Sequence, residues 1–335
     1  MTQFLFRTLA RLLTSDGSLA RCLVEPGVFR SDLDARARVQ LFKSLVNYVE
    51  FEPHAYCNRT CVFCPNSTLD RKNNREVFDR ALHRKVLNEL AEIDYSGTVA
   101  YSRYSEPLAR EEIFDYITEA RRALPRACLK IITNGDYLSH DRLQRLQSLG
   151  LNYLAVSIYL SETVAWSQQT ALEQIAKFSK RIGIGFQIRR KTRTRVFVDF
   201  TKNLSGMRMD ARCHDFGPGR QGFDRGMSVA WLSPSSFVRK DPCLFVFRNF
   251  TMDFNGNVMP CCNLRSDYSQ HAPFVLGNVS NETVFDIFSG PLFVQWRRTL
   301  STFTPKPPPC KHCQDAPMTG MRDKLLTAAL NLLST

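Results

Sequence analysis

The chain has 335 residues, of which 44% are hydrophobic and 23% are charged. This composition is typical of a globular protein with a buried core and excludes a mainly disordered chain. Lys and Arg total 45 against 32 Asp and Glu, a formal net charge of +13. That charge is compatible with an anionic surface, substrate or nucleic acid and says nothing about fold.

Eleven cysteines are the most discriminating feature of the composition. Arg7 and Arg11 interrupt the first apolar stretch, so no signal peptide is expected. No apolar run approaches the ~18 residues of a membrane span. We therefore expect a cytoplasmic protein, whose cysteines are metal ligands more readily than disulfides.

The length predicts about two domains at roughly 150 residues each. The first residues are expected to be helical, because Leu5, Leu9 and Leu12 recur at helical spacing. The expected parts are an N-terminal helical segment (1–45), a barrel core (46–205), an inter-domain loop region (206–242), a cysteine-rich auxiliary domain (243–320) and an amphipathic C-terminal helix (321–335).

Within the core, short apolar runs alternate with amphipathic helical runs. Strands are expected at Tyr48–Glu52, Thr98–Tyr101, Leu129–Thr133, Tyr153–Ile158 and Ile184–Ile188. Helices are expected at Phe78–Ile93, Glu111–Ala123 and Ala171–Arg181. This alternation predicts an α/β fold with a parallel sheet and right-handed crossovers. Five or six such units indicate a partial (β/α)6 TIM-like barrel, followed here by a small cysteine-rich α+β domain.

Cys57, Cys61 and Cys64 form C-x3-C-x2-C directly after the first expected strand. Three thiolates on one loop can hold three irons of a [4Fe–4S] cluster and leave the fourth iron open for a ligand. The alternative is a zinc site, in which His54 would complete a Cys3His set.

This motif resembles that of the radical S-adenosylmethionine (SAM) superfamily, C-x3-C-x-aromatic-C at the end of the first barrel strand, with Phe63 at the aromatic position. The resemblance implies that the three cysteines hold a [4Fe–4S] cluster whose open iron binds SAM. In that family the reduced cluster cleaves SAM to a 5′-deoxyadenosyl radical. It also implies that Phe63 packs near the adenine.

Further positions follow the family's order. Ser105 and Glu106 stand where the family has G-G-E-P, although Tyr104 and Ser105 replace the glycines. Asn134 lies in a T-N-G turn, and Ser157 lies in the fourth strand. The resemblance implies that Ser105, Glu106, Asn134 and Ser157 contact SAM, with Glu106 as a counter-charge for its ammonium.

A second set of cysteines follows as C-x17-C and C-x2-C: Cys243, Cys261, Cys310 and Cys313. Four thiolates can close a second [4Fe–4S] cluster, which would favour electron transfer, or they can hold a structural zinc. The pattern resembles the SPASM and twitch domains of radical SAM enzymes, with one auxiliary cluster. Cys262 is an alternative to Cys261 that the sequence does not decide.

Two reactions fit these cofactors: oxidation of an alcohol and epimerisation, on a small polar substrate of the aminocyclitol, sugar or nucleoside type. Cys213, in a glycine-rich loop, is a candidate hydrogen donor for epimerisation or a packing residue, and Arg225 is a candidate substrate contact. Neighbouring acid–base candidates are His214, Asp215 and Asp224.

Two other classes remain open, a maturase of a ribosomally made peptide and a non-catalytic metal or nucleic-acid-binding protein. The basic stretch 189–195 follows the fifth expected strand and either binds phosphate or carboxylate or is solvated. It lacks the interleaved aromatic residues of a single-strand nucleic-acid site, so nucleic acid is not the expected partner. The expected partners are a small-molecule or peptide substrate and an electron donor such as flavodoxin or ferredoxin.

Overall fold

The computed structural model describes residues 18–161, 164–216, 224–232, 236–315, 318 and 320–332. The chain divides into two compact units, which are taken separately below. Unit 1 comprises Met1–Val49, Phe223–Met252 and Gly256–Thr335, and unit 2 comprises Glu50–Gly222 and Asp253–Asn255. The helix expected around Leu9 lies outside the described residues.

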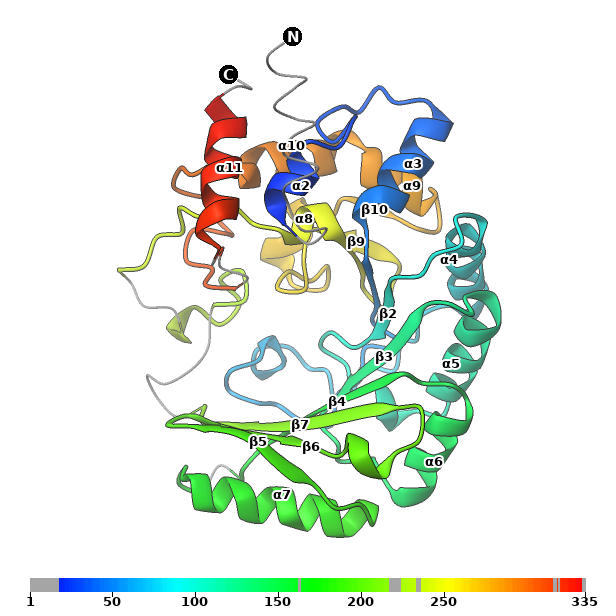
Figure 1. Cartoon of the computed structure of the whole chain (residues 1–335), viewed down its shortest axis with the longest axis vertical. Coiled ribbons are helices and arrows are strands. Elements are labelled where there is room, and N and C mark those ends of the chain that lie inside the picture. The colour runs from blue at the N-terminus through cyan, green and yellow to red at the C-terminus, as the bar shows by residue number, and fades with distance from the viewer. Residues whose placement is uncertain are drawn as a thin grey trace. The chain divides into compact units, whose positions relative to one another are not determined.

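Unit 2 is built on a curved sheet whose strand order is β1-β2-β3-β4-β7-β6-β5 (Figure 1). The strands are β1 (Tyr48–Phe51, of which Tyr48 and Val49 belong to unit 1), β2 (Thr98–Tyr101), β3 (Cys128–Thr133), β4 (Tyr153–Ile158), β5 (Gln187–Thr192), β6 (Arg195–Asp199) and β7 (Arg208–His214). Strands β2, β3, β4 and β7 pair in parallel, whereas β5 and β6 form an antiparallel hairpin beside β7.

Four helices line one face of this sheet (Figure 1): α4 (Arg80–Glu92), α5 (Glu112–Ala123), α6 (His140–Ser148) and α7 (Gln168–Ile182). In α7 the buried residues Ala171, Ile175, Phe178 and Ile182 recur at helical spacing, which turns one apolar stripe toward the sheet. The side chain of Ser167 accepts a hydrogen bond from the Thr170 N–H and caps the start of α7. The predicted α/β partial barrel is therefore confirmed.

The expected fifth strand differs from the observed one. Gly183 ends α7 in the left-handed region, with φ of 70°, and the chain enters β5 only at Gln187. Strand β5 is an exposed edge strand without an apolar face. The expected strand, Ile184–Ile188, therefore overlaps only the first two residues of β5. As a result the basic stretch 189–195 lies in the β5–β6 hairpin and does not follow a parallel strand.

Unit 1 contains helices and a small sheet. The helices are α2 (Leu19–Leu23), α3 (Ala35–Leu45), α8 (Phe245–Arg248), α9 (Val284–Ser289), α10 (Pro291–Ser301) and α11 (Met321–Leu332), and the strands are β8 (Asn249–Met252), β9 (Asn257–Met259) and β10 (Gly277–Asn278). Strands β8 and β9 pair antiparallel, and so do β9 and β10.

The core of unit 1 is rich in phenylalanine. The ring of Phe42 in α3 makes edge contacts with Phe250, Phe285 and Phe288 at centroid distances of 5.3–5.6 Å. The C-terminal helix α11 joins this unit through Asp323, whose carboxylate accepts hydrogen bonds from the first N–H groups of α2. Among the helices that the structure describes, none is long and apolar enough to cross a bilayer.

Candidate functional site

The loop that follows β1 brings three cysteines together. Cys57 is buried, and Cys61 and Cys64 are partly exposed. Burial, together with the neighbouring Glu106, Cys64 and Cys61, raises the pKa of Cys57 to about 12. Burial likewise raises the pKa of Cys61 to about 11, with Cys64 adding to the effect. A cation that bonded the thiolates would relieve this mutual repulsion.

The cysteine loop is tied to the turn after β3 by an ion pair. The guanidinium of Arg59 donates two hydrogen bonds to the Asp136 carboxylate, from Nε at 2.6 Å and from Nη2 at 2.7 Å. Asn58 Nδ2 donates to the same carboxylate at 2.7 Å, and Asn134 Nδ2 donates to Asn58 Oδ1 at 2.9 Å. A forked Arg–carboxylate pair restricts orientation as well as distance, so it orients the loop that carries the cysteines.

Glu106 lies in the loop that follows β2 and is fully buried. Its Oε1 accepts hydrogen bonds from Thr133 Oγ1 at 2.5 Å and from the Leu108 N–H at 3.1 Å, and its Oε2 accepts one from the Asn134 N–H at 2.7 Å. Burial raises its pKa to about 7, although these hydrogen bonds oppose the shift. Glu106 thus holds the turn after β3, and its expected contact with SAM stays a prediction.

The T-N-G turn needs glycine at its third position. Gly135 has φ of +74°, and a Cβ there would lie 2.8 Å from Val156 Cγ1 and 3.0 Å from the Phe178 ring. Any other residue would be strained by the backbone conformation and would clash with α7 and β4. The turn therefore lies close against both elements.

The other expected SAM contacts are distributed around the same end of the sheet. Ser105 is buried and its hydroxyl donates to the Ser102 carbonyl at 3.1 Å. Ser157 in β4 accepts a hydrogen bond from Arg212 Nε at 3.3 Å. Phe63 stacks on Phe216, with ring centroids 3.5 Å apart. These positions are compatible with the expected roles, and the roles remain predictions.

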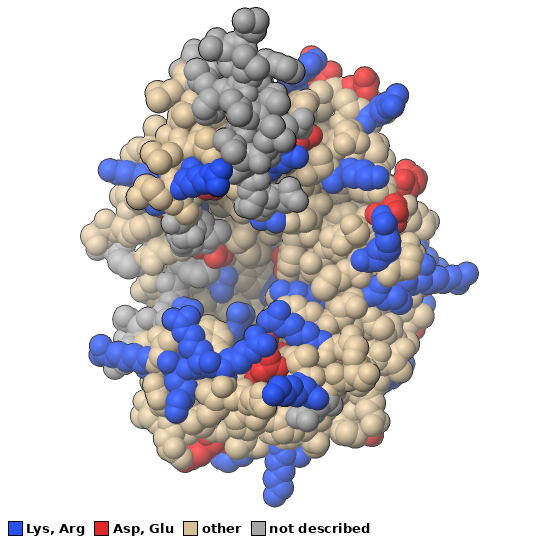
Figure 2. Space-filling model, in the orientation of Figure 1, with Lys and Arg blue, Asp and Glu red and all other residues tan. Residues whose placement is uncertain are grey.

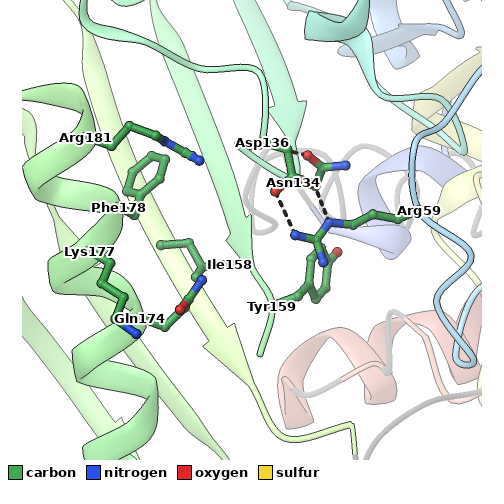
Figure 3. A pocket seen from close by; sticks show the side chains of 9 residues that line it. All are labelled: Arg59, Asn134, Asp136, Ile158, Tyr159, Gln174, Lys177, Phe178 and Arg181. Atoms are coloured by element: carbon green, nitrogen blue, oxygen red, sulfur yellow. Dashed lines mark hydrogen bonds and ion pairs between the residues drawn. The ribbon is translucent and has the colours of Figure 1, made fainter. Parts of the chain in front are cut away.

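A cavity of about 210 Å³ opens between this turn and α7 (Figure 3). Figure 3 shows the Arg59–Asp136 pair on one wall and the side chains of α7 on the other. The lining residues are Arg59, Asn134, Asp136, Ile158, Tyr159, Gln174, Lys177, Phe178 and Arg181. Of the expected SAM contacts, only Asn134 is among them.

A buried ion pair below the cysteine loop was not anticipated from sequence. Arg71 Nη1 donates to Glu52 Oε1 at 3.0 Å and to the Ala55 carbonyl at 2.7 Å, and the Tyr104 N–H donates to the same Glu52 oxygen. Both side chains are at most 1% exposed. The available signal was the pair of acidic residues, Glu50 and Glu52, in an otherwise apolar run, but the partner of Glu52 lies 19 positions away in the sequence.

In unit 1, four cysteines line one small cavity of about 20 Å³: Cys243, Cys261, Cys310 and Cys313. Cys262 is not among the residues that line it. Burial raises the pKa of Cys313 to about 11 and also raises that of Cys310. Arg239, itself 3% exposed, lines the same cavity.

Of the two remaining site candidates, Cys213 lies elsewhere than the sequence suggested, whereas Arg225 lies in a turn of the expected loop region. Cys213 lies in β7 and not in a loop, and it is fully buried. Its register partners are Ile158 and Val196, so its side chain shares their packed face of the sheet, which favours the packing role. Arg225 lies in unit 1 and donates from Nη1 to Asn263 Oδ1 at 2.8 Å. Asn263 lines the cysteine cavity.

The donor sets can be compared with the two metal chemistries. In the described residues, no group of three or more His, Cys, Asp or Glu side chains converges on a point as a single ion requires. Four-iron clusters do not require that convergence, because each cysteine bonds a different iron. His54, which the zinc alternative needed, is 2% exposed, and burial lowers its pKa to about 4. By number and type, the three thiols of the loop and the four thiols around the cavity are the donor sets of two iron–sulfur clusters.

Comparison with known families agrees with this geometry. Residues 51–159 match the radical SAM superfamily, and residues 243–314 match the SPASM iron–sulfur cluster-binding domain. The chain belongs to the radical SAM superfamily and carries a C-terminal SPASM domain. It is an enzyme whose cofactors are SAM, a radical SAM [4Fe–4S] cluster and an auxiliary iron–sulfur cluster. The non-catalytic alternative is thereby wrong.

One curated relative and two solved structures give the resemblance more detail. The chain is 27% identical over 272 residues to the S-adenosyl-L-methionine-dependent 2-deoxy-scyllo-inosamine dehydrogenase of Niallia circulans, covering 81% of this chain and 94% of the relative. The fold is similar to that of BtrN with AdoMet and 2-DOIA (22% identity, TM-score 0.53, 76% of this chain and 87% of that one). It is also similar to an open conformation of BtrN (22% identity, TM-score 0.50, 78% and 87%).

Proposed function

We propose that this enzyme is a dehydrogenase that oxidises an alcohol of a small polar substrate of the aminocyclitol class to a ketone. The observation that carries this proposal is the single cavity lined by four cysteines. A cluster whose four irons are all bonded to protein has no open coordination site and is suited to electron transfer. The name of the curated relative, an aminocyclitol dehydrogenase, supports the same reaction.

The residues that would hold the first cluster are Cys57, Cys61 and Cys64. When bound and reduced, this cluster supplies the 5′-deoxyadenosyl radical from SAM. The chain's own part is to hold the loop in place, through the Arg59–Asp136 pair and the hydrogen bonds of Glu106. We expect Cys243, Cys261, Cys310 and Cys313 to hold the auxiliary cluster.

Oxidation of an alcohol to a ketone removes one hydrogen atom, which the 5′-deoxyadenosyl radical would take, one electron, which the auxiliary cluster would take, and one proton. The chain must therefore supply a group that accepts the proton. His214 at the end of β7 is a poor acceptor, because burial and then the charges of Arg212 and Arg195 lower its pKa to about 3. The neighbouring Asp215 is buried at the same strand end. We assign proton acceptance to Asp215 and reduction of the first cluster to an external donor such as flavodoxin or ferredoxin.

The test is isotope transfer with the anaerobically reconstituted enzyme. We expect about eight irons per chain, and transfer of deuterium from the carbinol carbon of 2-deoxy-scyllo-inosamine or a related aminocyclitol into 5′-deoxyadenosine, with formation of the ketone. The variant C57A should form no 5′-deoxyadenosine. The variant D215N should still transfer deuterium but form the ketone at least tenfold more slowly. A product that keeps its hydroxyl with inverted configuration would overturn the proposal.

A further inference from the structure

Three arginines share one face of the sheet in unit 2. Arg212 in β7 lies opposite Phe197 of β6, and Phe197 in turn lies opposite Arg190 of β5. Arg195 is two residues from Phe197 along the same strand. Directly opposed residues, and residues two apart on one strand, point to the same face of a sheet. Arg190, Arg195 and Arg212 therefore project from the same side of three adjacent strands.

These guanidiniums are close enough to affect one another. Besides burial, the charges of Arg212 and then Arg190 lower the pKa of Arg195. Within the described residues, Arg190 and Arg212 form no ion pair with an acidic side chain. Figure 2 shows Lys and Arg side chains gathered over the part of unit 2 that contains β5, β6 and β7. Arg195 lies diagonally across from Arg190 on one side and from Arg212 on the other, so the like charges repel one another in the free protein.

The acids on this face are already bound to other arginines. Asp199 pairs with Arg189, and Asp210 pairs with Arg208 at 3.0 Å. Asp210 also accepts a hydrogen bond from the Tyr153 hydroxyl at 2.7 Å. The ion pairs of these two acids are therefore made with Arg189 and Arg208, and not with Arg190 or Arg212.

The cluster lies at the catalytic end of the sheet. Arg212 Nε donates to Ser157 at the carboxyl end of β4. Tyr159 lies two residues after Ser157, just beyond the strand, and the centroid of its ring is 5.4 Å from the ring centroid of Phe63 in the cysteine loop. The carboxyl ends of parallel strands are where such barrels place their substrates. The cluster can therefore reach a substrate that occupies the same end as the cysteine loop.

We propose that Arg190, Arg195 and Arg212 bind a phosphoryl group of the substrate, so that the enzyme acts on a phosphorylated polyol or aminocyclitol. This inference rests on the proposed function and narrows its substrate class. A phosphate dianion accepts several forked guanidinium hydrogen bonds, which would compensate the repulsion among three arginines. A carboxylate has two acceptor oxygens, whereas a phosphate monoester has three and can accept forks from more guanidiniums.

The experiment is calorimetric titration of the reconstituted enzyme without reductant. The probes are inorganic phosphate and myo-inositol 1-phosphate, with myo-inositol as the uncharged match. Both phosphates should bind, and myo-inositol 1-phosphate should bind at least tenfold more tightly than myo-inositol. The double variant R190Q/R212Q should weaken phosphate binding at least tenfold. A matched control is K191Q/R193Q, since Lys191 lies opposite Val196 on the other face of the same hairpin. This control removes equal charge and should keep the affinity of the wild type.

Two results would overturn the proposal. Equal losses in R190Q/R212Q and in the control would show only a general charge effect. A loss of SAM affinity in R190Q/R212Q with unchanged phosphate affinity would assign the arginines to the SAM carboxylate. If R190Q/R212Q does not fold, by circular dichroism and iron content, R190K/R212K keeps the charge and should still lose affinity through the missing forks. This experiment measures binding and not turnover. Its result therefore tests the phosphate site even if the dehydrogenase proposal fails.

Discussion

Arg239 Nη1 donates a hydrogen bond to the sulfur of Cys313 across 3.7 Å. The same buried guanidinium donates from Nη2 to the Pro242 carbonyl at 2.7 Å and from Nε to the Asp241 carbonyl at 3.0 Å, which hold it in place. Its positive charge interacts with three of the cysteines that line the cavity, Cys243, Cys310 and Cys313. Hydrogen bonds and positive charge at cluster sulfurs favour the more negative, reduced state of a cluster.

Replacing Arg239 should therefore change the potential of the auxiliary cluster. The variant R239Q should lower the midpoint potential by on the order of 60 mV, a tenfold change for one electron. The matched variant R239K keeps the charge and should shift the potential less. Redox titration followed by electron paramagnetic resonance measures both. An unchanged potential in R239Q with full iron content would contradict the prediction.

The cysteine cavity predicts which of two adjacent cysteines binds the auxiliary cluster. The variant C261A should lose about four irons per chain, as should C310A, because both side chains line the cavity. The variant C262A is the control and should keep its iron, because Cys262 does not line it. Iron analysis after anaerobic reconstitution decides the matter. Iron loss in C262A together with full iron in C261A would reverse the assignment.

The Arg59–Asp136 pair should protect the first cluster. The variant R59Q removes both hydrogen bonds of the fork and should destabilise the loop by about 1–3 kcal/mol. Iron at the three-cysteine site should then be released faster to a chelator. The variant R59K should restore little, because an ammonium cannot form the fork. If R59Q releases iron as slowly as the wild type, the Arg59–Asp136 pair is not needed to position Cys57, Cys61 and Cys64.

Glu106 should make stability depend on pH. Its pKa is raised from 4.5 to about 7 by burial, so the folded state binds the proton more tightly than the unfolded state. Its contribution to the free energy of unfolding is therefore fully present below pH 4.5 and declines as pH rises to about 7. The melting temperature of the wild type minus that of E106Q should be larger at pH 5.5 than at pH 8, because only the wild type loses this contribution as pH rises. A difference that grows with pH would refute this sign.

Much of the core could be read from periodicity. The spans of β2 and β4 agree with the expected strands, because apolar runs of this length between amphipathic helices leave few alternatives. The β5–β6 hairpin was not predicted, because its first strand is exposed and lacks an apolar face. Cys213 was misplaced for a related reason: the glycines after it suggested a loop, while pairing of β7 with both β4 and β6 extends that strand to His214.

By itself the sequence determined the chemistry available to this protein, because the number and spacing of thiolates restrict which clusters a chain can hold. It could not distinguish Cys261 from Cys262, since adjacent residues differ only in the direction in which they point. Nor could it show that Arg190, Arg195 and Arg212 share a face, because register between strands depends on packing of the whole sheet. Only the tertiary structure shows that Cys261 lines the cysteine cavity and that the three arginines share a face, since proximity between residues far apart in sequence is created by folding.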